Sequence, residues 1–333
     1  MAVTKKRTKK RSRAKTTTKS QTSNKGSKKT TKKTTKKTTQ LSKRKLITLC
    51  SSIDSTRQCD CKPKSLSCFP PKDWVVSQLG VWRFSYSKDD IREKKIHPAT
   101  YPLALPRKII SLMSHENALV LDPFVGSGTT LKAAKELNRN CVGFDLQQEY
   151  VDLSVTRLKQ ADLFSSSTQH IAICDDARNI SDYFDEQSID LIVTSPPYAN
   201  LLNRKRKNKS RRIRQNDQLD TIEQYSQNPR DLGTLEINAF TKELGDIFSR
   251  LLPLVRPKCH CVINVPDYWM DNKRYTLHIS VVNVMREVGF ELRNTIIWDK
   301  TNLVNAIGIF GYPSNYITMG TTFEYLLDFW RPE

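Results

Sequence analysis

The sequence has no long hydrophobic run. No stretch approaches the roughly 18 consecutive apolar residues that a transmembrane helix requires, and the amino terminus lacks the apolar core of a secretory signal. These absences argue against a membrane-spanning or secreted protein and predict one that stays inside the cell.

Acidic residues are missing from the first 45 positions, which hold 19 Lys or Arg. The whole chain carries a formal net charge of +21, so most of its excess charge sits in this segment. The segment is a Lys/Thr/Ser repeat with almost no apolar residue, and therefore cannot offset the entropy cost of ordering. We predict that residues 1–45 are a disordered basic tail. It attracts nucleic-acid phosphates without sequence preference, or else serves only solubility.

Cysteine is present eight times, but without a standard metal-binding spacing. Four lie in predicted strands and resemble small buried apolar groups: Cys141, Cys174, Cys259 and Cys261. Four others follow the tail: Cys50, Cys59, Cys61 and Cys68. Cys59, Cys61 and Cys68 could hold zinc, but the usual two-residue gap between ligands is absent. Reduced thiols and no metal are therefore the prediction, with zinc as the alternative.

Strand and helix patterns alternate from residue 118 onward. Strands are predicted at 118–124, 141–146, 171–174, 191–194, 261–265, 291–298 and 323–329, and helices at 129–137, 147–160, 237–252 and 277–288. This order predicts an α/β, doubly wound and mainly parallel sheet. The last two strands have no helix between them, which permits an antiparallel hairpin at one edge. Residues 46–96 show no clear period and are predicted to be an irregular arm, in which the aromatic patch 74–86 packs or forms a short strand.

Two motifs each end an apolar run. Asp122-Pro-Phe-Val-Gly-Ser-Gly-Thr-Thr130 is a glycine-rich turn between a strand and a helix, and Thr194-Ser-Pro-Pro-Tyr198 closes a later strand. Ligands bind at the carboxyl ends of the strands in open α/β sheets. Gly-Lys-Ser/Thr is absent, so the glycine turn is not a P-loop.

Together the two motifs resemble those of the amino-methylating DNA methyltransferases, which use S-adenosylmethionine. The resemblance implies a class I, Rossmann-like methyltransferase domain over residues 97–333, with a seven-stranded sheet and an antiparallel edge strand. It also implies that the segment 97–114 closes over the methionine end of the cofactor.

The resemblance assigns a set of cofactor-binding residues to the strand ends. They are Asp122, Phe124, Gly126, Gly128, Thr129, Asp145, Asp175 and Asp176. Asp145 follows Gly128 by 17 residues, where an acid can accept hydrogen bonds from two ribose hydroxyls. Asp175 or Asp176 would meet the adenine amine, and Asp122 would lie near the methionine ammonium group. A single aspartate at the end of a strand is more often a helix cap or a turn residue than a ligand-binding residue.

The catalytic residues that the resemblance implies are Ser195, Pro196, Pro197 and Tyr198. Ser195 Oγ and the Pro196 carbonyl are suitable acceptors for the two N–H bonds of an exocyclic amine, and the proline rings fix the backbone. Tyr198 offers a face on which a flipped base can stack. No proline precedes a cysteine, so the C5-cytosine class is disfavoured. Serine before Pro-Pro-Tyr resembles the N4-cytosine enzymes more than the N6-adenine enzymes, so the resemblance implies cytosine N4, and adenine N6 stays the alternative. A further alternative is a non-catalytic basic DNA-binding protein with a degenerate methyltransferase body.

Residues 199–235 are predicted to form a basic DNA-contact loop. Its basic residues cluster within 204–214, at Arg204, Lys205, Arg206, Lys207, Arg211, Arg212 and Arg214, together with Lys209. The predicted partners are double-stranded DNA and, in a restriction-modification system, a cognate restriction endonuclease. The predicted location is the cytoplasm, associated with the nucleoid, or the nucleus if the host is eukaryotic.

Overall fold

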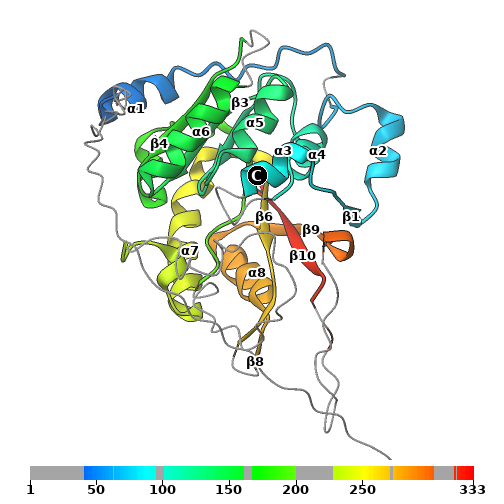
Figure 1. Ribbon diagram of the computed structural model, residues 1–333. Coiled ribbons are helices and arrows are strands. Elements are labelled where there is room, and N and C mark those ends of the chain that lie inside the picture. The colour runs from blue at the N-terminus through cyan, green and yellow to red at the C-terminus, as the bar shows by residue number, and fades with distance from the viewer. Residues whose placement is uncertain are drawn as a thin grey trace, which may run out of the picture. The chain divides into compact units, whose positions relative to one another are not determined.

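The computed structural model describes residues 41–62, 64–94, 101–160, 167–199, 228–270, 273–303, 319 and 321–333 (Figure 1). Residues 41–333 group into one compact unit. Residues 1–40 of the predicted basic tail and residues 200–227 of the predicted DNA-contact loop lie outside the described residues. No helix among the described residues is long and apolar enough to cross a membrane.

An eight-stranded sheet forms the centre of the unit. Its strands are β1 (Val81–Arg83), β2 (Leu119–Asp122), β3 (Asn140–Asp145), β4 (His170–Cys174), β5 (Ile189–Thr194), β6 (Val255–Val265), β9 (Glu291–Asp299) and β10 (Phe323–Trp330). Their spatial order is β4-β3-β2-β5-β6-β10-β9-β1. Among these described strands, β10 runs antiparallel to its neighbours β6 and β9, and the other pairs are parallel. A short hairpin of β7 (Tyr268–Met270) and β8 (Lys273–Tyr275) lies apart from this sheet.

The strand order confirms the predicted class I methyltransferase fold. The seven predicted strands correspond to β2 through β6, β9 and β10, and the last two form the expected antiparallel hairpin. Within that side of the sheet, β10 is inserted between β6 and β9 rather than lying outermost. An eighth strand, β1, comes from the aromatic patch 74–86 and pairs in parallel with β9.

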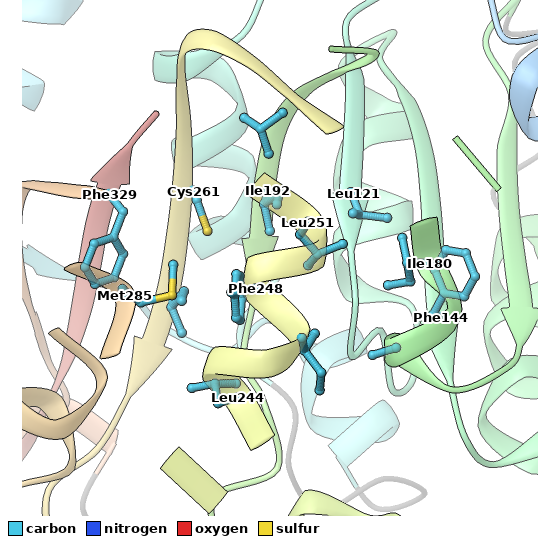
Figure 2. Packing of buried hydrophobic residues seen from close by; sticks show 14 of the residues in the cluster. Leu121, Phe144, Ile180, Ile192, Leu244, Phe248, Leu251, Cys261, Met285 and Phe329 are labelled. Atoms are coloured by element: carbon cyan, nitrogen blue, oxygen red, sulfur yellow. The ribbon is translucent and has the colours of Figure 1, made fainter. Parts of the chain in front are cut away.

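Helices cover both faces of the sheet. They are α4 (Ala104–Met113), α5 (Thr129–Glu136), α6 (Gln148–Gln160), α7 (Ile237–Leu251) and α8 (Leu277–Val288), with the 3-10 turn η1 (Ala177–Asp182). One apolar cluster joins the sheet to α7, α8 and η1 through residues such as Ile192, Phe248 and Met285 (Figure 2). A second cluster joins the opposite face to α4 and α5 through residues such as Ile109 and Leu131. Because alternate residues of buried strands point to opposite faces, the strands read as continuous apolar runs.

Residues 41–94 are part of the same compact unit. They contain α1 (Lys43–Ser51), α2 (Pro71–Ser77), β1 and α3 (Lys88–Lys94). Cys50 on α1 is 2% exposed within the first apolar cluster, and Lys43 Nζ lies 3.0 Å from Asp182 Oδ2. The segment predicted to be an irregular arm therefore contributes a strand to the sheet and a helix to the core.

Candidate active site

The two sequence motifs end neighbouring strands. β2 and β5 pair in parallel, with Leu121 opposite Ile192, so their carboxyl ends lie at the same sheet edge. Thr194 Oγ1 at the end of β5 donates to Asp122 Oδ1 at the end of β2 at 2.6 Å. The glycine-rich turn (residues 122–130) and the proline corner (residues 194–198) therefore lie side by side.

Asp122 is a buried brace behind this edge. Its carboxylate also accepts hydrogen bonds from Thr130 Oγ1 at 2.5 Å, Phe124 N at 3.1 Å and Tyr101 Oη at 3.4 Å. Burial raises the pKa of Asp122, and the surrounding donors only partly oppose that shift. Asp122 is 1% exposed, so its carboxylate links the two motifs from inside the protein. Contact between Asp122 and a methionine ammonium group stays a prediction.

The glycine turn places backbone close to the next strand. Gly128 precedes α5 with φ of +80°, a conformation that favours glycine. Gly126 N donates to Asp145 Oδ2 at 3.1 Å, and Gly126 O accepts from Ser154 Oγ at 2.9 Å. The turn is thus held between the end of β3 and helix α6.

Asp145 has an unusual protonation equilibrium. Its pKa is raised to about 7. Burial is the main cause, and the nearby Asp231 and Asp122 carboxylates act in the same direction. The hydrogen bonds from the N–H groups of Gln147 and Gly126 oppose this shift. Each carboxylate oxygen accepts one backbone N–H, with Gln147 N at 2.8 Å from Oδ1. A carboxylate oxygen can accept more than one hydrogen bond, so Asp145 has capacity for hydroxyl donors of a ligand.

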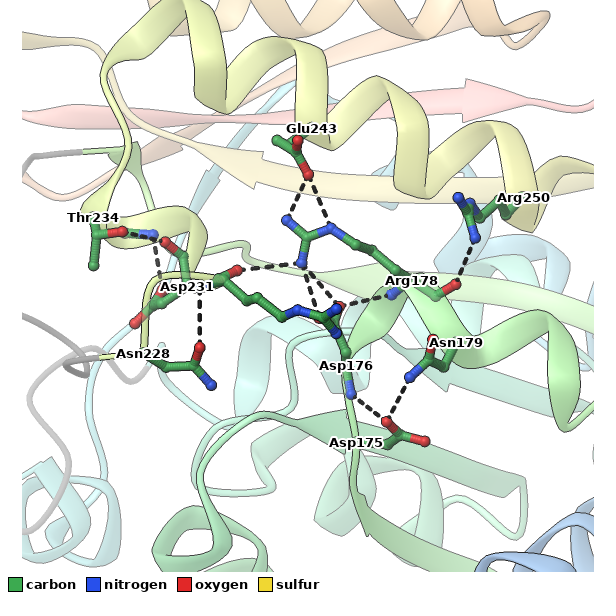
Figure 3. A network of polar contacts seen from close by, with 11 residues as sticks. Asp175, Asp176, Arg178, Asn179, Asn228, Asp231, Thr234, Glu243 and Arg250 are labelled. Carbon is green, nitrogen blue, oxygen red and sulfur yellow. Dashed lines mark hydrogen bonds and ion pairs between the residues drawn. The ribbon is translucent and has the colours of Figure 1, made fainter.

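Asp175 and Asp176 follow β4 and are already engaged with protein donors (Figure 3). Asp175 accepts from Asn179 Nδ2 at 2.8 Å and from Tyr183 Oη at 2.6 Å. Burial alone would raise the pKa of Asp175, but these hydrogen bonds lower it. Asp176 caps η1 and binds the Arg178 guanidinium, with Nη1 at 3.0 Å from both of its oxygens.

Arg178 ties this edge of the site to helix α7. Its Nε and Nη2 donate to Glu243 Oε2 at 2.9 and 2.6 Å. It also donates to the Arg230 carbonyl at 3.2 Å, and Arg230 Nη1 lies 3.4 Å from Asp176 Oδ2 (Figure 3). The network fixes residues 230–232 at the site, where they line the cavity.

Hydrogen bonds connect Ser195, Tyr198 and Asn264 at the proline corner, and we call this chain of contacts the polar relay. Tyr198 Oη donates to the Asn264 carbonyl at 2.9 Å and accepts from Asn264 Nδ2 at 3.0 Å. Ser195 Oγ lies 2.5 Å from Tyr198 Oη. A tyrosine hydroxyl has one proton; with that proton directed to the Asn264 carbonyl, the Ser195 hydroxyl donates in the Ser195–Tyr198 bond. The lone pairs of Ser195 Oγ are then available as acceptors.

A cavity of about 260 Å³ lies between the two motifs. Ten of the predicted catalytic and cofactor-binding residues line it: Phe124, Gly126, Thr129, Asp145, Asp175, Asp176, Ser195, Pro196, Pro197 and Tyr198. Two others do not line it, Asp122 and Gly128, which support the turn from behind. Tyr198 is 8% exposed, so little of its ring is open for base stacking.

Several residues that line the cavity are not singled out by the sequence motifs. The Tyr101 hydroxyl lies in hydrogen-bond contact with Thr130 Oγ1, and Tyr101 belongs to the segment predicted to close over the cofactor. Asn264 Nδ2 donates to Glu324 Oε2 at 2.7 Å, and Glu324 forms an ion pair with Lys300. The signal for Asn264 was a polar residue before Val-Pro at the end of a predicted strand. Nothing in the local pattern pointed to Lys300 or Glu324, which meet only after the sheet has formed.

The predicted DNA-binding residues of the 204–214 run lie outside the described residues. The described chain stops at Ala199 and resumes at residue 228, and both of these ends lie close to cavity-lining residues. DNA contact by this run stays a prediction.

The match to a known protein family covers the glycine-rich turn and ends before the Ser195–Tyr198 motif. Residues 2–156 match the model of the N6/N4 methyltransferase family, described as DNA methylase. The type II methyltransferase M.HpaI of Haemophilus parainfluenzae is 42% identical over 78 residues, which are 23% of this chain and 25% of the relative. The type II methyltransferase M.HindIII of Haemophilus influenzae is 47% identical over 66 residues, 20% of this chain and 21% of the relative. The chain thus spans about a quarter of the length of these curated relatives.

Among solved structures, a candidate DNA modification methylase from Thermus thermophilus is similar. It is 27% identical, with a TM-score of 0.32, and the match covers 48% of this chain and 52% of that one. The same methylase has also been solved in complex with S-adenosyl-L-methionine.

Proposed function

We propose that the chain is an N6/N4 amino-methyltransferase that methylates an exocyclic amino group of a base in double-stranded DNA; the family match over residues 2–156 supports this. The donor is S-adenosylmethionine, and the acceptor is N4 of a flipped cytosine. The similarity to proteins named type II methyltransferases supports an activity of the restriction-modification type.

One observation carries the proposal. The Ser195–Tyr198 corner and the glycine turn line one cavity at the carboxyl ends of two adjacent parallel strands. Methyl transfer needs the donor carbon and the acceptor nitrogen in line and in near contact, so two binding corners must share one space. The cavity provides that space.

The lining fits the chemistry of S-adenosylmethionine. Asp145 has free acceptor capacity for the two ribose hydroxyls, and Phe124 offers an apolar ring beside them. The lining contains five acidic and three basic side chains, a balance that suits a cationic ligand: Asp145, Asp175, Asp176, Asp231 and Glu324, against Arg178, Arg230 and Lys300. When bound, the cofactor supplies an electrophilic methyl group.

The chain's own residues orient the acceptor. The lone pair of an exocyclic amine is delocalised into the ring of the base, and it becomes nucleophilic when acceptors draw its two N–H bonds out of that plane. Ser195 Oγ is such an acceptor, because its own proton is directed to Tyr198. The Pro196 carbonyl is the second, in a backbone fixed by two prolines. The catalytic terms are orientation and electrostatics rather than proton abstraction, since the nitrogen loses its extra proton only after transfer.

Serine at position 195 supports cytosine N4 as the acceptor. Adenine N6 is chemically the same kind of amine, and the polar relay would hold it equally well. The nucleoside product therefore has to decide between them.

The direct experiment is methyl transfer to DNA. The full chain is incubated with S-adenosylmethionine labelled in its methyl group and with genomic DNA from a strain that lacks methyltransferases, beside a parallel RNA sample. The DNA is then digested, and its nucleosides are identified by mass spectrometry. We expect N4-methyldeoxycytidine. N6-methyldeoxyadenosine would overturn the choice of base, and label in RNA alone would overturn the DNA assignment.

Ser195→Ala tests the relay. Removing the acceptor should lower kcat on the order of 100-fold, as loss of one positioned hydrogen-bonding group does in other enzymes, while cofactor affinity stays near the wild-type value. Ser188→Ala is the matched control, because Ser188 is half-buried, does not line the cavity and bonds locally to the Asp185 carbonyl. Equal kcat for Ser195→Ala and wild type would remove Ser195 from the mechanism.

A further inference from the structure

Four potential metal ligands converge on the side of the unit formed by the amino-terminal segment. Three are the thiols of Cys59, Cys61 and Cys68, and the fourth is the imidazole of His115, between α4 and β2. All four ligand atoms lie within 4.8 Å of one another. His115 Nδ1 is 3.3 Å from Cys59 Sγ and 3.5 Å from Cys68 Sγ.

The two separations between His115 Nδ1 and a cysteine Sγ are close to those of a tetrahedral zinc site. With zinc–sulfur bonds of about 2.3 Å and zinc–nitrogen bonds of about 2.0–2.1 Å, the sulfur–nitrogen edge of a tetrahedron is about 3.6 Å and the sulfur–sulfur edge about 3.8 Å. A Cys₃His set with no position left for water is typical of a structural site.

The imidazole is held in the orientation that metal binding requires. His115 Nε2 lies 2.8 Å from the Ser65 carbonyl, which can only accept, so Nε2 carries the proton. The lone pair of Nδ1 then faces the sulfur atoms. A hydrogen bond from the other ring nitrogen to a carbonyl is the usual arrangement of a metal-bound histidine.

Hydrogen-bond donors also support the sulfur atoms. Arg57 Nε donates to Cys59 Sγ at 3.2 Å, and Glu116 N donates to Cys68 Sγ at 3.3 Å. Three thiolates around a divalent cation leave one net negative charge, which the Arg57 guanidinium offsets. Arg57 Nη2 also donates to the Lys62 carbonyl at 3.0 Å and therefore holds the chain between the ligands in a loop.

We propose that Cys59, Cys61, Cys68 and His115 bind one zinc ion that fastens the amino-terminal segment to the catalytic sheet. Between α1 and α2, the described residues form no helix or strand, so regular backbone pairing does not hold this segment. Asn117 Nδ2 donates to the carbonyls of Asp54 and Thr56, and zinc binding adds an attachment for residues 59–68, because the energy of a structural site contributes directly to folding. The sequence favoured reduced thiols because the fourth ligand comes 47 residues after Cys68 and the close cysteine pair has only one residue between its members.

The metal content of the purified full chain tests the proposal. Inductively coupled plasma mass spectrometry should find one zinc per chain after gel filtration. Growth with cobalt should give the visible absorption of tetrahedral cobalt, together with a strong near-ultraviolet thiolate-to-metal band. Both signals should disappear in Cys61→Ser and in His115→Ala.

Cys174→Ser is the matched control, since Cys174 is an exposed thiol outside the cluster, and it should keep the full metal content. Circular dichroism and cofactor binding show whether each variant still folds. Wild-type protein without stoichiometric zinc, or with zinc unchanged in Cys61→Ser, overturns the proposal. A failed methylation assay would not, because the metal measurement is independent of activity.

Discussion

At the scale of single residues, the direction of one proton decides what Ser195 can do. The Tyr198 hydroxyl gives its hydrogen to the Asn264 carbonyl and accepts from Asn264 Nδ2, which leaves Ser195 as a donor to Tyr198. The serine oxygen therefore faces the cavity as an acceptor. Asn264 is a positioning residue, because it acts on the serine only through Tyr198.

Asp145 predicts a pH dependence of cofactor binding. Its pKa of about 7 means that the carboxylate is largely protonated below pH 7 and ionised above it. Ribose hydroxyls bind the ionised form better, so cofactor affinity should rise from about pH 6 to pH 8 and then level off. Isothermal titration calorimetry across this range measures the effect.

Asp145→Asn should flatten that pH profile and weaken binding by at least about tenfold, since a hydrogen bond to a charged group contributes roughly 1.5–3 kcal/mol. Asp152→Asn on the exposed face of α6 is the matched control and should keep the wild-type profile. A pH-dependent affinity in Asp145→Asn equal to that of the wild type would assign the titration to another group.

Residue patterns predicted the two site corners but not the partners that orient them. Asp145 and Ser195 stand at the ends of apolar runs, where the sheet topology brings them together. Tyr101, Asn264 and Glu324 reach the same cavity from distant parts of the chain. Their roles depend on tertiary packing, which no local pattern encodes.

At the scale of secondary-structure elements, the turn between β2 and α5 depends on glycine at position 128. A Cβ on Gly128 would lie 2.7 Å from Ser154 Oγ and 3.1 Å from Ser154 Cα, so the clash includes backbone as well as side chain. The turn can hold its position against α6 only because no side chain is present there.

Gly128→Ala should lower the free energy of unfolding by at least about 2 kcal/mol. A positive φ alone costs a non-glycine residue roughly 1–2 kcal/mol, and the contact with Ser154 adds to that cost. Thermal denaturation should show a drop in Tm of several degrees. Gly80→Ala is the control, because a Cβ there meets nothing within 4 Å. Equal Tm values for the two variants would contradict the turn geometry.

Element prediction was most accurate where strands and helices alternate. The helix expected at 277–288 is α8 with the same bounds, and those at 129–137 and 237–252 differ from α5 and α7 by one residue. β6 begins at Val255 rather than 261, because Val255 pairs with Ile189 of β5; the register then shifts, and pairing with β5 and β10 covers His260 onward. β1 has three residues and exists only because β9 offers a free edge, so its pattern was too short to predict firmly.

At the scale of the whole molecule, charge is divided between a folded unit and a basic tail. Residues 1–40 hold 16 of the Lys and Arg residues and no acid. The folded unit begins with α1, whose Lys43 lies 3.0 Å from Asp182 and whose Cys50 is buried. The tail can therefore be removed at residue 40 without cutting into the folded unit.

Deleting residues 1–40 should weaken DNA binding and reduce its salt dependence, because fewer counterions are released from the phosphates. The value of kcat at saturating DNA should stay unchanged. Fluorescence anisotropy at several salt concentrations, with a parallel methylation assay, measures both quantities. Loss of kcat with retained DNA binding would place catalytic function in the tail and support a different division of the chain.

The proposed methyl transfer requires that one cavity binds both the cofactor and the base. A crystal structure with S-adenosylhomocysteine tests this most directly. We predict that the ribose hydroxyls bind Asp145 and that the sulfur faces Ser195 across a gap one nucleobase wide. A ligand bound outside this cavity, or with its sulfur directed away from Ser195, would contradict the account.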